Sequence, residues 1–415
     1  RCDLMAPLDG WTVIELSSQA TAFAGKLLAD MGADVIVVEP PGGSPLRNLG
    51  PFLDDQPGPE HSLYWWHYNT SKRSVVLDLE DPEGRVTFEA LVADAGILLE
   101  GERPGRLAEL GIDYPDLVGV RPDLVHCSVT PFGRQGPRSD EHVTDLTILA
   151  TGGPVWSCGY DDHEIPPVRG GGHQGYQTGG VWAVISILTA AIHRRHAGAG
   201  QHIDVSNHAA VNVTTEAATY SWLVAGSEVQ RQTGRHAVHR PTTPTQVQCA
   251  DGKYLNTGVP PRRPEEFKVL HQWLVEPELD QEFPLAPLLE LGGTYENIGM
   301  AEIEEDPMIA EVFGAGRDAI GLIAGRLSAN DAFIGFQSRG IPVGPVNAPE
   351  DVMNDPHFIA RGFVVDVDHD DVGRSFQYPG APISMTGSPF AAPTRAPLVG
   401  EHTEEVLGLL DPEHR

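Results

Sequence analysis

The sequence predicts an α/β fold, with a doubly wound parallel sheet in a large domain and a smaller second domain. Short runs rich in β-branched residues alternate with helical patterns through the first 200 residues, as in parallel strands joined by crossover helices. The pattern then changes to longer helical stretches and a hairpin. A chain of 415 residues is also too long for one simple core and suits two domains of ordinary size.

The first part of the chain predicts strands and crossover helices in alternation. Apolar runs predict strands at 11–16, 34–40, 73–79, 96–101 and 123–133. Helices are predicted at 21–32, where Gly32 ends the pattern, and at 81–96, where Asp81 is the N-cap and Pro82 the first helical residue. A glycine-rich loop then leads into the apolar run 181–192, which predicts a buried helix.

The rest of the chain predicts mixed structure. Residues 206–226 are expected to be helical, and 234–258 to form a long connection and a hairpin around an Asp-Gly turn. Helical stretches continue to about Leu327, and the segments 340–358 and 379–389 then have strand and loop character. Thr403 is the predicted cap of a short C-terminal helix.

Composition narrows the classes of function. The formal net charge of −30, without a basic run, argues against nucleic acid as a partner, because its phosphates would be repelled. The longest apolar run has 12 residues, whereas a bilayer span needs about 20, so no membrane segment is predicted. Four cysteines without CxxC spacing fit a reducing compartment, and a cytoplasmic location is expected.

Several common site motifs are missing. No GxGxxG follows the first strand and no GxxxxGK[ST] occurs, so neither a dinucleotide fingerprint nor a P-loop is supported. HExxH and GxSxG are absent as well, and neither a metal nor a hydrolase triad is expected. The strand-exit loop 133–137 lies where parallel sheets bind ligands, and it is either such a site or an ordinary turn.

Several phrases, in order along the chain, resemble one family. They are GADVIVVEPPGGSPLR from Gly32, NTSKRSVVLDLEDPEGR from Asn69, ERPGRLAELGIDYPDL from Glu102, SVTPFGRQGP from Ser128 and HRRHAGAGQHIDVSNHAA from His193. The chain is similar to the class III CoA-transferases, which include formyl-CoA and carnitine CoA-transferases and α-methylacyl-CoA racemases. The resemblance runs from about Leu8 to Leu410.

The resemblance implies a fold, an assembly and substrates. A Rossmann-like large domain would be built from residues 1–204 and 331–415, with a linker and a small α+β domain at 205–330. Two subunits would interlock like chain links in an obligate dimer, as a homodimer or as a heterodimer with a paralogous CoA-transferase subunit. The substrates would be an acyl-CoA and a carboxylic acid, with coenzyme A held against the large domain.

The nucleophile that the resemblance implies is missing. In the family's transferases an Asp ahead of a buried helix attacks the acyl-CoA carbonyl and forms an acyl-aspartyl anhydride. That position falls at Tyr176, or at Gly175 with the racemase spacing, and neither residue can form the anhydride. The racemase branch also needs a His, whose place is held by Thr144.

Other residues near this loop could transfer protons. His173, His142 and Glu141 lie close to it in sequence, although a histidine in a solvated loop without a catalytic role is the plainer interpretation. Tyr176 would be a poor base unless it is activated, because a phenol ordinarily has a pKa near 10.

The implied CoA pocket is partly kept and partly altered. Gln19 and Ala20 match a pair that lines the family's CoA site, and four cations could hold CoA phosphates: Arg47, Lys72, Arg73 and Arg103. Gly101 and Glu102 replace an Asn-Phe pair, however, and Glu109 replaces a basic residue. Carboxylates there would repel CoA phosphates.

Three hypotheses follow. The chain is a class III CoA-transferase, or an enzyme of a related acyl-CoA reaction, with a non-standard active site. Alternatively, it is the non-catalytic subunit of a heteromeric CoA-transferase whose partner carries the Asp. A further alternative is an acyl-CoA racemase, isomerase or lyase that uses acid–base chemistry from His173, Tyr176 or Glu141.

Overall fold

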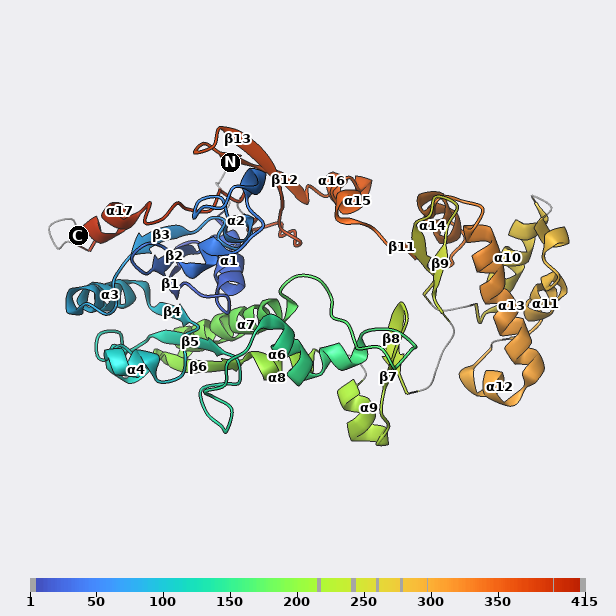
Figure 1. Ribbon diagram of the computed structural model, residues 1–415, viewed down its shortest axis with the longest axis horizontal. Coiled ribbons are helices and arrows are strands. Elements are labelled where there is room, and N and C mark those ends of the chain that lie inside the picture. Colours follow the sequence, from blue (N-terminus) through green and yellow to red (C-terminus); the bar gives the residue numbers. More distant parts are fainter. Residues whose placement is uncertain are drawn as a thin grey trace. The chain divides into compact units, whose positions relative to one another are not determined.

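The computed structural model describes residues 5–214, 218–239, 244–258, 261–276, 279–296, 298–390 and 392–410. Contacts divide the chain into two compact units (Figure 1). The large unit consists of three segments of the chain: the part up to Trp156, Val168–Val224, and the part from Met353 onward. The small unit takes Ser157–Pro167 and Ala225–Val352, so the boundaries differ from the predicted 205 and 330.

A six-stranded parallel sheet, within the described residues, organises the large unit. The strand order is β3-β2-β1-β4-β5-β6. The strands are Thr12–Leu16 (β1), Asp34–Glu39 (β2), Arg73–Val76 (β3), Ile97–Glu100 (β4), Val125–Thr130 (β5) and Gln201–Ser206 (β6). The order reverses between β1 and β4, which confirms the predicted doubly wound α/β class and marks the edge where such sheets bind ligands.

Helices cover both faces of this sheet. The helices α1 (Ala22–Asp30) and α7 (Gln174–Ala197) pack on one face, and α3 (Pro82–Ala95) packs on the other (Figure 1). Successive side chains of β1 point to opposite faces of the sheet. Val13 therefore packs in the core under α1 and α7, and Ile14 packs in the core under α3. The strands that sequence patterns predicted are therefore those buried on both faces.

The other elements before residue 226 are short. The helices are α2 (Leu63–Tyr68), α4 (Arg106–Leu110), α5 (Tyr114–Leu117), α6 (Asp145–Gly152), α8 (Asn207–Val213) and α9 (Ala218–Ala225). Three single turns of 3-10 helix are η1 (Pro45–Asn48), η2 (Leu53–Asp55) and η3 (Pro154–Ser157). Helix α8 packs against α6 and α7, which keeps this segment in the large unit.

Helix α7 is the long core helix of the large unit. Its length and composition meet the criteria for a membrane span, but half of its most apolar window is buried inside the fold. Ala183, Val184 and Ile187 pack on the sheet against the side chains of β5 and β6. The apolar run therefore serves the core, and the helix begins well before it, at Gln174.

The small unit combines helices with short antiparallel strands. Its strands are β7 (Gln230–Gln232), β8 (Arg235–Val238), β9 (Gln246–Gln248), β10 (Tyr254–Asn256) and β11 (Gly344–Pro345). Its helices are α10 (Pro264–Val275), η4 (Leu279–Glu282), α11 (Ala286–Gly292), α12 (Met300–Glu305), α13 (Pro307–Ala324), α14 (Ala329–Gln337) and α15 (Pro349–Met353), the last of which continues one residue into the large unit. The predicted hairpin is β9–β10. The hydrophobic core of the small unit lies among α10, α11, α13 and α14.

Two expectations for the C-terminal segment were wrong, the first of them in part. Residues 340–358, expected as strand and loop, have this character around β11, but they also contain α15 and the start of α16 (Pro356–Ala360), because proline begins each helix and Asp355 caps the second. A hairpin, β12 (Val364–His369) and β13 (Arg374–Pro379), follows. Thr403 is the first residue of α17 (Thr403–Gly408) rather than its cap, and its Oγ1 accepts a hydrogen bond from Val76 N at 3.1 Å.

Candidate active site and its surroundings

A cavity of about 430 Å³ opens at the carboxyl ends of β1 and β4. Three loops and the first turn of α7 line it. Its walls are Ser18, Gln19, Ala20, Gly101, Glu102, Arg103, Pro104, Pro131, Ser139, Asp140, Glu141, His142, Val143 and Tyr176. The structure thus brings together five predicted site residues, Gln19, Ala20, Arg103, Glu141 and Tyr176, at the switch point of the sheet.

The N-terminus of α7 is already occupied by a carboxylate. Asp145 Oδ1 accepts hydrogen bonds from Gly175 N at 2.8 Å and from Tyr176 N at 3.2 Å. Asp145 is 7% exposed, and its Oδ2 has no hydrogen-bond partner among the described residues, although Arg169 Nη1 lies 3.7 Å away. Free backbone N–H groups at a helix start bind anions, and here this chain supplies the anion itself.

Gly175 packs closely against Asp145. A Cβ at this position would lie 3.0 Å from Asp145 Oδ1 and 3.3 Å from the Asp145 carbonyl oxygen. A side chain at position 175, where the racemase spacing would put the Asp, would therefore crowd Asp145, which would have to shift by a few tenths of an ångström.

Tyr176 lines the cavity as a neutral phenol. Burial raises its pKa, and the negative charge of Asp145 adds to the increase. Ionisation of the hydroxyl is thus opposed at neutral pH, so Tyr176 can donate a hydrogen bond but is a weak nucleophile and a weak base.

The other proposed proton carriers are dispersed. Glu141 and His142 are exposed residues of the loop that lines the cavity. His173 precedes α7 and makes an edge contact with Tyr64, with ring centroids 5.1 Å apart, and it is not among the cavity walls. The three side chains therefore do not form one acid–base group.

Arg103 is the one predicted phosphate-binding cation at the cavity. Its guanidinium is paired with Glu109 of α4 at 2.5 Å. Arg106 of α4 bridges Glu109 and Glu80, so both arginines, one before the helix and one in its first turn, are held by carboxylates. Where the resemblance implied a basic residue, Glu109 forms ion pairs with both neighbouring arginines.

The other three cations, Arg47, Lys72 and Arg73, do not line this cavity and form ion pairs within the protein. Arg47 is fully buried, paired with Glu39 at 2.7 Å and stacked on Trp65. Lys72 is buried against Glu15 at 2.7 Å. Because these charges are neutralised inside the protein, the geometry gives no support to their binding of CoA phosphates.

Arg73 is the first residue of the outer strand β3, at the end of the strand remote from the sheet edge that carries the cavity. It pairs with Asp34 of β2 and with Glu405 of α17, the latter at 3.1 Å. These contacts tie the C-terminal helix to the sheet edge, and Arg73 lines neither cavity at the switch point.

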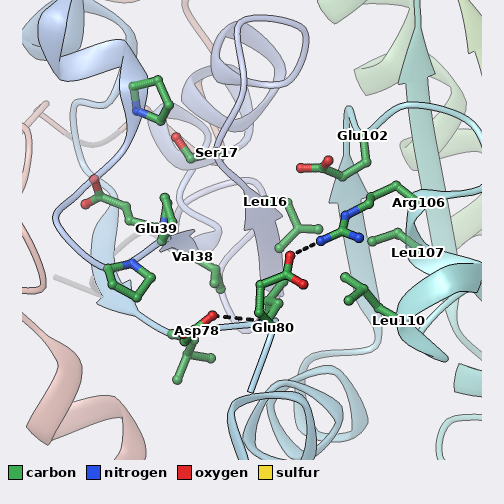
Figure 2. A pocket seen from close by; sticks show the side chains of 15 residues that line it. Leu16, Ser17, Val38, Glu39, Asp78, Glu80, Glu102, Arg106, Leu107 and Leu110 are labelled. Atoms are coloured by element: carbon green, nitrogen blue, oxygen red, sulfur yellow. Dashed lines mark hydrogen bonds and ion pairs between the residues drawn. The ribbon is translucent and has the colours of Figure 1, made fainter. Parts of the chain in front are cut away.

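A second cavity, of about 290 Å³, lies at the ends of β1, β2 and β3, and its charge is mainly negative. Figure 2 shows Asp78, Glu80 and Glu102 around it, with Arg106 reaching toward Glu80. Glu39 also lies in its wall but is held by Arg47. Burial, together with the nearby Glu100 carboxylate, raises the pKa of Glu102. An anionic ligand would meet carboxylates here.

The loop 133–137 has a structural explanation. Arg134 N donates to the Asp204 carboxylate of β6 at 2.9 and 3.1 Å, and its guanidinium pairs with Asp113. Its residues line neither cavity at the switch point, which favours the turn interpretation.

The sequence did not indicate that Asp145 lies at the start of the long helix. Asp145 follows Thr144 and matches the Asp after the His of the racemase phrase, but it lies 30 residues before Gly175 in the chain. The signal was present in the capping box formed by Thr144 and Thr147, which places Asp145 in the first turn of α6. Only the packing of α6 on α7 reveals where its carboxylate points.

Comparisons with known proteins agree with this architecture. Residues 8–403 match CoA-transferase family III. The succinyl-CoA:(R)-benzylsuccinate CoA-transferase subunit BbsE of Thauera aromatica is 31% identical, over 95% of this chain and 92% of the relative. Succinate–glutarate CoA-transferase of Agrobacterium fabrum is 30% identical, over 98% and 96%. The crystal structure of a CAIB/BAIF family protein from Brucella suis superposes with a TM-score of 0.77 at 27% identity, covering 98% of this chain and all of that one.

Proposed function

The chain belongs to CoA-transferase family III, and we propose that it is the subunit without a nucleophile in a heteromeric enzyme that moves CoA between carboxylic acids. The observation that carries this proposal is the start of α7. The backbone N–H groups there bind the carboxylate of Asp145, and the side chain facing the cavity is the phenol of Tyr176. A phenol in this environment cannot form the mixed anhydride on which the covalent route depends.

The charges around the cavities support the same proposal. Coenzyme A carries several negative charges on its phosphates, and the walls present Asp78, Glu80 and Glu102. The two arginines nearby, Arg103 and Arg106, are paired with Glu109 and Glu80. A subunit that binds CoA poorly can still complete a site whose nucleotide is held by its partner.

Exposed apolar side chains supply a surface for a partner subunit. On α7, Val181, Trp182, Ile185 and Ile192 are 38 to 59% exposed, at spacings that put most of them on one side of the helix. On α9, Trp222, Leu223 and Val224 are 60 to 85% exposed. Large apolar residues grouped in this way are typical of protein–protein interfaces, and we assign these two helices to the interface with the catalytic subunit, interlocked as the family resemblance implies.

The relatives suggest the class of substrate. Those compared above act on succinyl-CoA with benzylsuccinate or on succinate and glutarate. The acyl donor proposed for the assembled enzyme is therefore a dicarboxylic acyl-CoA such as succinyl-CoA, and the acceptor is a carboxylate.

The test compares the chain alone with the chain in a mixture. The purified chain is incubated with succinyl-CoA and a panel of carboxylate acceptors, with and without a class III paralogue that carries the loop Asp. We expect turnover only in the mixture, and we expect it to disappear when the paralogue's Asp is changed to Ala. Turnover by this chain alone, at the rate of the mixture, would contradict the proposal.

A second candidate function rests on Asp145. Its Oδ2 has no hydrogen-bond partner among the described residues, so the carboxylate could attack the thioester carbonyl, forming an anhydride as the CoA thiolate leaves. The chain would then be a self-sufficient transferase. Hydroxylamine converts such an acyl-enzyme to a hydroxamate at the modified residue, and peptide mass spectrometry would locate it at Asp145. The favoured proposal requires that no hydroxamate forms on this chain.

A further inference from the structure

We propose that the opposite edge of the sheet, at the amino ends of its strands, carries a separate site for a small dianionic oxyanion. Arg121, Arg194 and Arg195 converge there on a cavity of about 240 Å³. Its remaining walls are Gly10, Trp11, Thr12, Asp94, Ala95 and Ile97. The site lies entirely in the large unit and does not depend on the proposed transferase role.

This cavity is distinct from the two at the switch point. It is lined by Thr12 and Ile97, the first residues of β1 and β4, whereas the others are lined by residues at or after the ends of those strands. Strand β1 has five residues, so its two ends are separated by roughly 13 Å. A ligand at one edge therefore does not reach the other.

Two of the arginines are fixed in place by backbone carbonyls. Arg121 Nη1 donates to Ala93 O at 2.7 Å, and Arg194 Nη1 donates to Gly96 O at 2.8 Å. These bonds satisfy carbonyls at the C-terminal end of α3. Both guanidinium groups flank Gly96, where a Cβ would lie 2.9 Å from Arg121 Nη2 and 3.1 Å from Arg194 Nη1. The positions of both groups are thus set before any ligand arrives.

The three arginines keep unused donors. Among the described residues, no hydrogen bond is made by Arg121 Nη2, by Arg194 Nη2 or by the guanidinium of Arg195. Arg195 instead lies over the Trp11 ring, 5.7 Å from its centroid. Forked guanidinium groups with free N–H donors match the oxygen pairs of carboxylates and phosphates.

The local charge also favours an anion, because three arginines face two carboxylates. Asp94 is one of the cavity walls, and Asp123 lies between Arg121 and Arg194, with its oxygens 2.6 Å and 4.0 Å from their Nε atoms. Burial lowers the pKa of Arg194, and the positive charges of Arg121 and Arg195 lower it further against the opposing effect of Asp123. A bound dianion would relieve this repulsion, in a protein whose net charge of −30 discourages anions elsewhere.

The binding test uses inorganic phosphate and succinate as separate probes. Calorimetric titration of the full-length chain, at constant ionic strength set with sodium chloride, should give one site per chain for at least one of the two. Arg195→Gln should weaken that binding at least tenfold, and Arg195→Lys should restore part of it, because Lys keeps the charge but loses the fork. Phosphate and succinate are compared to decide between a tetrahedral anion and a dicarboxylate.

The matched control is Arg361→Gln, which removes an exposed arginine elsewhere on the large unit. It should bind the probe as the wild type does. The proposal is overturned if neither anion binds, if Arg195→Gln binds as tightly as the wild type, or if both variants lose affinity equally, since that would indicate a general effect of net charge.

Discussion

At the residue level, the function turns on one carboxylate that points at a helix N-terminus. Asp145 accepts hydrogen bonds from two N–H groups in the first turn of α7, and it lies close enough to position 175 to favour glycine there. The same interaction occupies a place where the helix could bind an anion and holds the start of α7 against α6.

Replacing Asp145 by Ala should destabilise the large unit. The variant loses two charge-assisted hydrogen bonds to buried N–H groups, and we expect the free energy of unfolding to fall by about 2 kcal/mol. Urea denaturation followed by circular dichroism measures the change. Asp140→Ala, which removes an exposed carboxylate from the same region, should unfold like the wild type.

His67 should make stability depend on pH. Burial, with a smaller contribution from the positive charge of Lys26, lowers its pKa from the usual 6.5 to about 4. The folded state therefore keeps His67 neutral while the unfolded chain binds a proton, so stability is complete above pH 6.5 and falls as the pH drops toward 4, by up to about 3 kcal/mol.

The measurement for His67 is a series of urea denaturations between pH 7 and pH 4. His67→Gln should flatten the part of this dependence that is due to the histidine, whereas His196→Gln, at an exposed position on α7, should leave it unchanged. An identical pH dependence in His67→Gln and the wild type would show that other groups account for the acid sensitivity.

At the level of elements, the ion pairs around α4 set the charge that an anion meets at the carboxyl edge of the sheet. Glu109 of α4 holds Arg103, and Glu80 after β3 holds Arg106, so the two cations that could meet a phosphate are already paired. The negative charge at this edge depends largely on these two carboxylates, and replacing both of them tests whether they prevent anions from binding.

The double variant Glu80→Lys/Glu109→Lys should gain affinity for coenzyme A. It frees Arg103 and Arg106 and adds two cations beside the cavities, and we expect CoA to bind at least tenfold more tightly than to the wild type in calorimetric titration. The control Glu83→Lys/Glu404→Lys changes the net charge equally at exposed positions. Equal gains in both variants would assign the effect to overall charge.

At the level of the whole molecule, we expect the exposed apolar residues of α7 to be covered by the proposed partner subunit. Trp182→Glu/Ile185→Glu should prevent association with the catalytic paralogue, because charges would be buried at the interface. Light scattering after size-exclusion chromatography measures the assembly. Val86→Glu, which alters an exposed apolar residue on α3, should assemble normally. Association of the double variant at wild-type strength would place the interface elsewhere.

The sequence alone determined the class of fold and the family. Central strands such as β1, β2 and β5 are buried on both faces, so their apolar runs can be recognised without a structure. Strand β6 was not predicted because most of its residues are partly or fully exposed and it carries Gln201, His202 and Asp204. The other edge strand, β3, has two buried residues at its centre and was predicted from its apolar run.

Only the tertiary structure decided which charges are available. Arg47 and Lys72 are indistinguishable in sequence from ligand-binding cations, and folding places each against a buried carboxylate. Asp145 is distant in sequence from the start of α7, and the packing of α6 on α7 brings its carboxylate to the first N–H groups of that helix. Electrostatic roles depend on distances between side chains, and those distances are fixed by contacts between segments that sequence spacing does not relate.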